Sequence, residues 1–261
     1  MLRSLFTAAT GMDAQSLRMD VIANNLANTS TVGFKKGRAE FEDLISEKLH
    51  GAAAPDPRGG TSPSPLEVGL GVRTANTARS LAQGDMLETQ NQLDVAIQGQ
   101  GFFRIQRPNG EYAYTRAGNF RVDATGRLVT QNGEMVQPEI NVPSQSTSIT
   151  IGADGAVTAL VSGRPEAQPL GTLQLYTFAN PGGLEATGNN LLNATVGSGD
   201  AVGSKPGEQG AGTLAQGYLE NANVQAVQEM IDMIATQRGY ELNSKVIQTA
   251  DQMLQRLTSL R

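Results

Sequence analysis

The feature that most constrains this chain is an apolar repeat of seven residues that occurs at both of its ends. In the N-terminal segment the repeat consists of Leu5, Met12, Met19 and Leu26, with Ile22 beside it. In the C-terminal segment it consists of Met233, Tyr240, Ile247 and Leu254, with Leu257 beside it. Strict spacing by seven favours a helix that supercoils around a partner helix. We therefore expect the two termini to pair with each other as a coiled coil.

The two repeats predict long helices over about residues 4–28 and 224–259. Turn-forming and β-branched residues between Thr29 and Gly33 end the first helix, and Asn221 or Asn223 is the expected cap of the second. At 1.5 Å per residue the second helix would be about 54 Å long, which exceeds the diameter of a small domain. Its apolar stripe cannot be buried against a compact body alone.

The chain between the two helices changes character once. Residues 47–75 are rich in proline and glycine, which predicts an extended loop or linker without regular elements. From about residue 93 to 216 apolar side chains recur with a period of two. Turn signals recur there at Asn109-Gly110, Asn132-Gly133, Asp154-Gly155 and Ser162-Gly163. The middle region is therefore predicted to be all-β.

The expected fold class is α+β and elongated. Four regions are predicted: an N-terminal helix in 1–32, an extended Pro/Gly-rich linker region in 33–92, an all-β domain in 93–216 and a C-terminal helix in 217–261. The chain of 261 residues contains only 7 Phe, 5 Tyr and no Trp. Because aromatic side chains contribute much of the buried area of compact cores, their scarcity indicates thin cores. Long helices at both extremities are typical of subunits that stack their ends into a shared tube, so the layout indicates a structural polymer.

Composition excludes several classes of partner and site. The net charge is −5 without any block of like charge, which argues against nucleic acid or an anionic membrane as the main partner. Apolar runs are far shorter than a spanning helix requires, so we expect no membrane insertion. The first 15 residues lack the features of a cleaved secretory signal. The absence of cysteine excludes disulfides and thiolate chemistry.

The sequence offers no recognisable catalytic constellation. The single histidine, His50, has no carboxylate or hydroxyl at a triad spacing. Acidic pairs such as Glu42 and Asp43 are better explained as solvated faces than as acid/base pairs. No calcium loop and no complete phosphate-binding glycine motif occurs. We expect no enzymatic activity, no metal and no cofactor.

A group of asparagines marks the end of the first predicted helix. Asn24, Asn25 and Asn28 are poor helix formers in its last turns. They either donate directional hydrogen bonds to a neighbouring subunit or belong to a fraying, self-capped helix end, and spacing alone leaves both open. Asn243 lies inside the C-terminal seam, where one buried asparagine can set helix register.

Several segments resemble the bacterial flagellar rod and hook family. The N-terminal one runs from Ala23-Asn24-Asn25-Leu26 to Gly33-Phe34-Lys35, and the C-terminal one includes Gln237-Arg238-Gly239-Tyr240-Glu241-Leu242-Asn243. Between them lie Gly99-Gln100-Gly101-Phe102-Phe103, Tyr114-Thr115-Arg116-Ala117-Gly118 and Gln216-Gly217-Tyr218 with Glu220-Asn221-Ala222-Asn223. The resemblance covers both ends and the middle, and its linker is most similar to the distal rod members. Gly239 departs from relatives, which often have alanine there.

The resemblance implies a non-catalytic axial subunit, a helical homopolymer of the distal rod that transmits torque to the hook. It implies export through the flagellar type III apparatus without signal cleavage and assembly in the periplasm, with other rod proteins, the hook protein and ring proteins as partners. From the heptads and the family motifs together, the expected assembly interface consists of Leu5, Met12, Met19, Ile22, Asn24, Asn25, Leu26, Asn28, Gly33, Phe34, Met233, Tyr240, Asn243, Ile247, Leu254 and Leu257.

Three alternatives remain open at this stage. Within the family, the chain could be a proximal rod or hook-like axial protein, and the long linker is the feature that separates these from the distal rod. Outside it, a secreted peptidoglycan hydrolase would need a catalytic frame that His50 alone does not supply. A β-domain adhesin would leave the two heptad segments unexplained.

Overall fold

The two ends of the chain form the two long helices of the molecule, α1 (Leu2–Ala27) and α2 (Ala226–Ser259), in a computed structural model that describes residues 2–50, 66–163 and 166–259. Both lie within about two residues of their predicted bounds. The residues between them are β-rich, so the fold class is α+β as expected. Two compact units result, and each is built from separate stretches of the chain.

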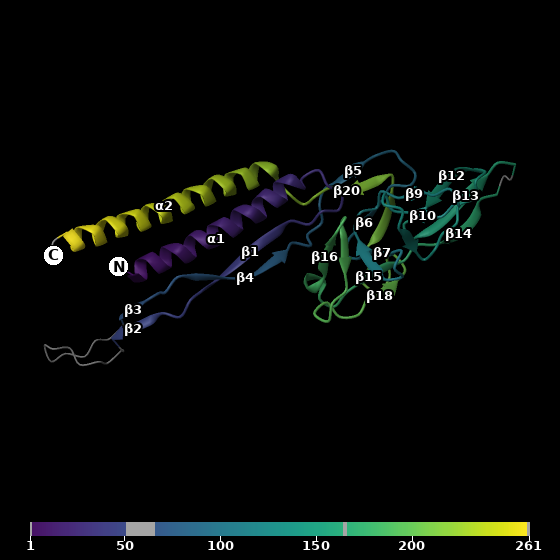
Figure 1. The fold of residues 1–261 in the computed structure, drawn as a ribbon. Coiled ribbons are helices and arrows are strands. Elements are labelled where there is room, and N and C mark those ends of the chain that lie inside the picture. Colours follow the sequence, from purple (N-terminus) through teal and green to yellow (C-terminus); the bar gives the residue numbers. More distant parts are fainter. Residues whose placement is uncertain (1, 51–65, 164–165, 260–261) are drawn as a thin grey trace. The chain divides into compact units, whose positions relative to one another are not determined.

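Unit 1 comprises Met1–Ala27, Gly37–Ala78 and Gln225–Arg261. In it α1 and α2 lie side by side, as Figure 1 shows in purple and yellow. Strand β1 (Gly37–Asp43) packs against α1 and pairs with β4 (Val72–Arg79). Strand β2 (Glu47–His50) pairs in antiparallel fashion with β3 (Leu66–Val68).

These strands correct the expectation that residues 47–75 carry no regular element. Glu47 pairs with Val68 and Lys48 with Glu67, so the ends of the proline-rich segment form a two-stranded ladder. In the sequence, the prolines of this segment all fall between the residues of the two strands. Most of the predicted linker 33–92 therefore belongs to the same unit as the helices. Residues 51–65 lie outside the described part of the chain.

Unit 2 comprises Asn28–Lys36 and Arg79–Val224, and its strands pair antiparallel. Its largest sheet has the order β16 (Glu185–Gly188), β17 (Leu191–Asn193), β8 (Tyr112–Thr115), β7 (Phe103–Gln106), β11 (Met135–Gln137), β10 (Leu128–Val129), β9 (Arg121–Val122). A three-stranded sheet consists of β12 (Ser146–Ile151), β13 (Ala156–Val161) and β14 (Gln168–Thr172). Two-stranded ladders join β6 (Val95–Gln98) to β19 (Thr213–Gln216), β5 (Met86–Glu88) to β20 (Tyr218–Glu220), and β15 (Leu175–Thr177) to β18 (Val202–Ser204). The short 3₁₀ helix η1 is Pro181–Gly183.

The predicted hairpin turns are confirmed. Gly110, Gly133, Gly155 and Gly163 all have positive φ, the conformation that favours glycine. Alternating side chains of the strands between them point into one apolar core, in which Phe103 and Phe120 meet edge to face with ring centroids 5.0 Å apart. A second, smaller aromatic cluster forms around Phe102, Tyr114, Tyr176 and Phe178. Unit 2 thus has a packed core of its own.

Candidate functional site

The two helices of unit 1 pack antiparallel in a constant register. Asn25 of α1 donates to Glu229 of α2 over 3.2 Å. Ten residues back along α1, Gln15 lies against Gly239, ten residues forward along α2. Four residues further in each helix, Gly11 lies under Asn243. The helices therefore keep one register over about four turns.

The residues of α2 that face α1 most closely are small or polar. They recur every seven residues and are the buried Glu229, Thr236 and Ala250 and the half-buried Asn243. The residues of the predicted seam lie beside this row and are less buried. Met233, Ile247 and Leu254 are half-buried, and Tyr240 is 42% exposed. Small residues in the contact let two helix backbones approach closely, which places the larger side chains at its flanks. The side chain of Leu257 lies outside the described residues.

The same offset occurs on α1. Leu5, Met12, Met19 and Leu26 are half-buried, whereas Ile22 is buried, as are Ala8 and Ala14. On α2 the buried residues lie three or four positions from the half-buried apolar ones, and on α1 the same spacing relates Ala8 and Ile22 to Leu5, Met12, Met19 and Leu26. The flanking apolar residues are only half covered within one chain, so they retain surface that can be buried by another element.

Asn25 explains part of the asparagine group at the end of α1. Its side-chain amide exchanges two hydrogen bonds of 2.9 Å with the backbone of Gly37, and it is 3% exposed. With its bond to Glu229, it connects the last turn of α1, the start of β1 and the first turn of α2. Asn25 therefore does not belong to a frayed helix end. Asn24 is exposed, and the half-buried Asn28 accepts from Thr31.

Gly33 and Phe34 lie at the beginning of unit 2. Gly33 has φ +70°, and a Cβ there would lie 2.8 Å from the backbone nitrogen of Ala117. Its own N–H donates to the carbonyl oxygen of Glu220 over 2.7 Å. Gly33 is therefore needed for a turn that passes close to two distant segments, and Phe34 beside it is half-buried.

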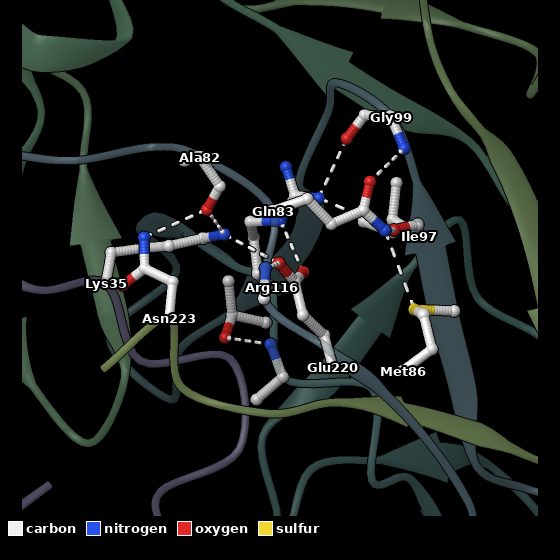
Figure 2. Close-up of polar contacts among 12 residues, drawn as sticks. Lys35, Ala82, Gln83, Met86, Ile97, Gly99, Arg116, Glu220 and Asn223 are labelled. Atoms are coloured by element: carbon white, nitrogen blue, oxygen red, sulfur yellow. Dashed lines mark hydrogen bonds and ion pairs between the residues drawn. The ribbon is translucent and has the colours of Figure 1, made fainter. Parts of the chain in front are cut away.

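Three charged side chains form a closed cluster next to this turn (Figure 2). Lys35 Nζ lies 2.6 Å from Glu220 Oε1, and Arg116 Nε lies 2.9 Å from Glu220 Oε2. Their side chains are 5%, 0% and 5% exposed for Lys35, Glu220 and Arg116. The backbone N–H of Gly84 also donates to Glu220 Oε1 over 2.9 Å. One carboxylate thus joins four separate stretches of the chain.

Further hydrogen bonds extend this ion cluster (Figure 2). Lys35 Nζ donates to the carbonyl of Ala82, and the amide of Asn223 donates to that same oxygen. Arg116 Nη2 donates to the carbonyl of Gly99 over 2.8 Å, and Gln83 Oε1 accepts from the N–H of Gly99. Since charged groups are buried at little cost only when they are paired and hydrogen-bonded, these contacts are what permits the cluster.

The cluster carries one more cation than anion. Burial lowers the pKa of Lys35, and repulsion from Arg116 lowers it further, whereas the hydrogen bond and charge of Glu220 oppose both. All three side chains are almost fully buried and hydrogen-bonded to one another, so the arrangement holds distant parts of the chain together.

The sequence prediction of site residues missed Lys35, Arg116 and Glu220. A signal was present, because three of the segments with family resemblance each contain one of them. Spacing could not pair residues that lie 104 and 185 positions apart in the chain.

One face of α2 points away from α1 and is apolar. Val227, Ile231, Ile234 and Leu242 are 72%, 54%, 53% and 65% exposed. We call these four residues the outer row of α2. Arg238 lies between Ile234 and Leu242 on this face. Exposed apolar side chains of this size that gather on one helix face are characteristic of interaction surfaces.

In the part of the chain that the structure describes, no three His, Asp or Glu side chains gather as metal ligands would. No helix among the described residues is long and apolar enough to span a membrane.

Comparison with known proteins places the whole chain. Three family models match: "Flagella basal body rod protein" over residues 5–35, "Flagellar hook protein FlgE/F/G D1 domain" over 96–159 and "Flagellar basal body rod FlgEFG protein C-terminal" over 215–260. The chain is 47% identical over 260 residues to the flagellar basal-body rod protein FlgG of Buchnera aphidicola, and 48% identical over 261 residues to that of Caulobacter vibrioides. Both matches cover 100% of either chain. The FlgG of Borreliella burgdorferi is 46% identical over 97% of both chains.

Proposed function

Because the chain belongs to the FlgG family of flagellar basal-body rod proteins, we propose that it is a non-catalytic subunit of the distal rod and polymerises there into a helical, torque-transmitting shaft. The observation that carries this proposal is full-length similarity at 46–48% identity to rod proteins of three bacterial groups. The alternative of a hook-like protein is supported less, since a hook protein of Borreliella burgdorferi is only 26% identical.

The helices of unit 1 carry the surface to which we assign the polymer contact. We infer that neighbouring subunits cover the outer row of α2 and the half-covered flanks of the α1–α2 seam. This proposal assigns the interface to Leu5, Met12, Met19, Leu26, Met233, Tyr240, Ile247, Leu254 and Leu257, and it makes the helix pair part of a multi-stranded coiled-coil assembly. Asn24, Asn28 and Phe34 are proposed as further contacts, whereas Asn25, Gly33, Ile22 and Asn243 act by shaping the subunit.

Location and partners follow from the family and are part of the proposal. The subunit would be exported by the flagellar type III apparatus without signal cleavage and would assemble in the periplasm. Other rod proteins, the hook protein and the surrounding ring proteins would be its neighbours. Mass spectrometry of the exported protein tests the first point, since an intact N-terminal segment is expected and a cleaved one would contradict it.

Complementation tests the function. In a strain that lacks its own FlgG, this chain should restore motility and basal bodies with a completed rod, seen by electron microscopy. Failure of the wild-type chain to do so, despite secretion, would contradict the proposed function. The double variant Ile231→Gln, Ile234→Gln should be exported but yield few completed rods, because it removes apolar area that only a neighbour buries. Gln248→Ser, at an exposed polar position of α2, is the matched control.

A further inference from the structure

Unit 2 presents one apolar side chain entirely to solvent. Val196 lies in the loop between β17 and β18 and is 103% exposed. At this exposure the side chain of Val196 is not packed against any other part of its own chain. The loop around it shows whether this exposure is incidental.

The loop is held by a dense set of hydrogen bonds. Ser198 is fully buried, and its hydroxyl accepts from Thr195 N over 2.9 Å and donates to Thr195 O over 2.8 Å. Thr195 Oγ1 donates to the carbonyl of Gly183, and Asn180 Nδ2 donates to that of Gly197. A Cβ at Gly183 would lie 2.6 Å from the backbone carbon of Gly197, so the two segments are in direct backbone contact. Val196 is therefore displayed by a fixed turn.

Unit 2 also contains a mainly apolar recess. This recess has a volume of about 290 Å³, and Leu81, Phe102, Phe178 and Pro181 form its apolar lining. Phe102 and Phe178 meet edge to face with centroids 5.9 Å apart. The volume is at the lower limit of small-molecule sites, which suits one or two protein side chains better than an extended ligand. We call it the Phe102 pocket.

The ion cluster fixes one wall of the Phe102 pocket. The Arg116 guanidinium lies 5.8 Å from the ring of Phe102 and donates to Gly99 O. Gly99 N–H donates in turn to Gln83 Oε1, and Gln83 Nε2 donates to the carbonyl of Ile97. Gln83, Gly99 and Arg116 all line the pocket. The pocket is therefore preformed, and an occupant would not have to order it.

We propose that Val196 of one subunit inserts into the Phe102 pocket of a second copy. This rests on the proposed function, in which copies of the chain polymerise. Val196 and the Phe102 pocket are both apolar and lie on different segments of one chain. Val196 does not fill the pocket of its own chain, because its side chain is fully exposed. When a projection on one copy fits a recess on the next, the contact is heterologous, and it generates an open helical polymer where the rotation between copies does not close a ring.

The absence of cysteine in the natural chain permits a direct test. A tagged copy with Val196→Cys is mixed with an untagged copy carrying Leu81→Cys, assembled into rods, and oxidised. A disulfide forms only when the two Cβ atoms come within about 3.5–4.5 Å. A tagged–untagged dimer on a non-reducing gel is the expected result, and mixing makes it necessarily a contact between copies. The control pair, Val196→Cys with Ser162→Cys at the exposed β13–β14 turn, should give none.

The outcomes separate the two proposals. Rods that assemble without a Val196→Cys/Leu81→Cys dimer above the control would overturn the inserted-valine contact and leave the rod function intact. A wild-type chain that forms no rods contradicts the function itself. In addition, Val196→Asp should reduce rod yield roughly tenfold or more, because burial of one aliphatic side chain is lost at every contact. Its thermal unfolding should match the wild type, since Val196 has no contact within the subunit.

Discussion

The charge imbalance of the ion cluster leads to a prediction about which member can be removed. Glu220 is the one anion between two buried cations, Lys35 and Arg116. Glu220→Gln would leave both cations buried without a countercharge. Lys35→Met would instead leave a balanced Arg116–Glu220 pair, and the carboxylate would keep its bond from the N–H of Gly84.

The expected magnitudes differ severalfold. Breaking a buried ion pair so that a charge is left uncompensated costs about 3–5 kcal/mol. For a unit of this size each kcal/mol lowers the melting temperature by about 2–4 °C, so Glu220→Gln should lower it by about 10 °C. Lys35→Met removes the excess cation, whose pKa is already lowered by burial, and places an apolar side chain in the same volume. We expect a change in the free energy of unfolding of about 1 kcal/mol or less.

Near-ultraviolet circular dichroism of the full-length monomer measures this, because four of the five tyrosines lie in unit 2. Thermal unfolding of the wild type, Glu220→Gln, Lys35→Met and the double variant gives a double-mutant cycle, which measures the interaction energy between the two positions. The double variant should be more stable than Glu220→Gln alone, since it removes one of the two uncompensated cations. If Lys35→Met is as destabilising as Glu220→Gln, charge balance does not govern the cluster and the reasoning is refuted.

Three other predictions concern single positions. Gly239→Ala should stabilise unit 1 by up to about 1 kcal/mol, measured as the melting of its helices, because an added Cβ lies 3.4 Å from Gln15, which is an ordinary contact. Gly11→Ala places its Cβ 2.8 Å from Asn243 and should stabilise unit 1 less. Equal stabilisation by the two variants would contradict the packing. Gly33→Ala should cost about 1–3 kcal/mol in unit 2 unfolding, since φ is +70° and the added carbon meets backbone; a wild-type melt would rule out the strained turn. Asp123 accepts from Thr125 and Arg127, which lowers its pKa well below 3.8, so the stability it contributes is present above pH 3.8 and is lost as pH falls below that value. The stability difference between wild type and Asp123→Asn should therefore shrink on acidification, and a pH-independent difference would disprove this role.

Periodicity and turn chemistry were sufficient to predict the helices, the hairpin turns and the β-rich middle from the sequence. Period seven marks a helix whatever it packs against, and pairs such as Asn109-Gly110 act locally. The same periodicity did not show which row of each helix is buried within one chain, because apolar size alone does not determine which side chains the partner helix covers. Thr236 and Ala250 are buried at 2% exposure, and Tyr240 is not.

The ion cluster and the Asn25 contacts could not be predicted because they are long-range. Asn25 and Glu229 are separated by 204 positions, and no local pattern relates them. The strands at the ends of the proline-rich segment were missed for a related reason. These strands form because Glu47 and Lys48 pair with residues about 20 positions away, Val68 and Glu67. The proline and glycine content reflects only the residues between the two strands.

The interleaved construction of the two units has a consequence for the order of folding. Pairing α1 with α2 in an otherwise unfolded chain closes a loop of about 200 residues, and loop-closure entropy rises with the logarithm of loop length. Once unit 2 has folded, Asn223 bonds to the backbone of Lys36, which brings the residues just after α1 and just before α2 together. If the remaining loop behaves as one of about 15 residues, the entropic penalty for joining the helices falls by about 2 kcal/mol. Folding of unit 2 therefore brings the ends of the two helices together. The helix that is synthesised last can then pair with the first one by closing only a short loop.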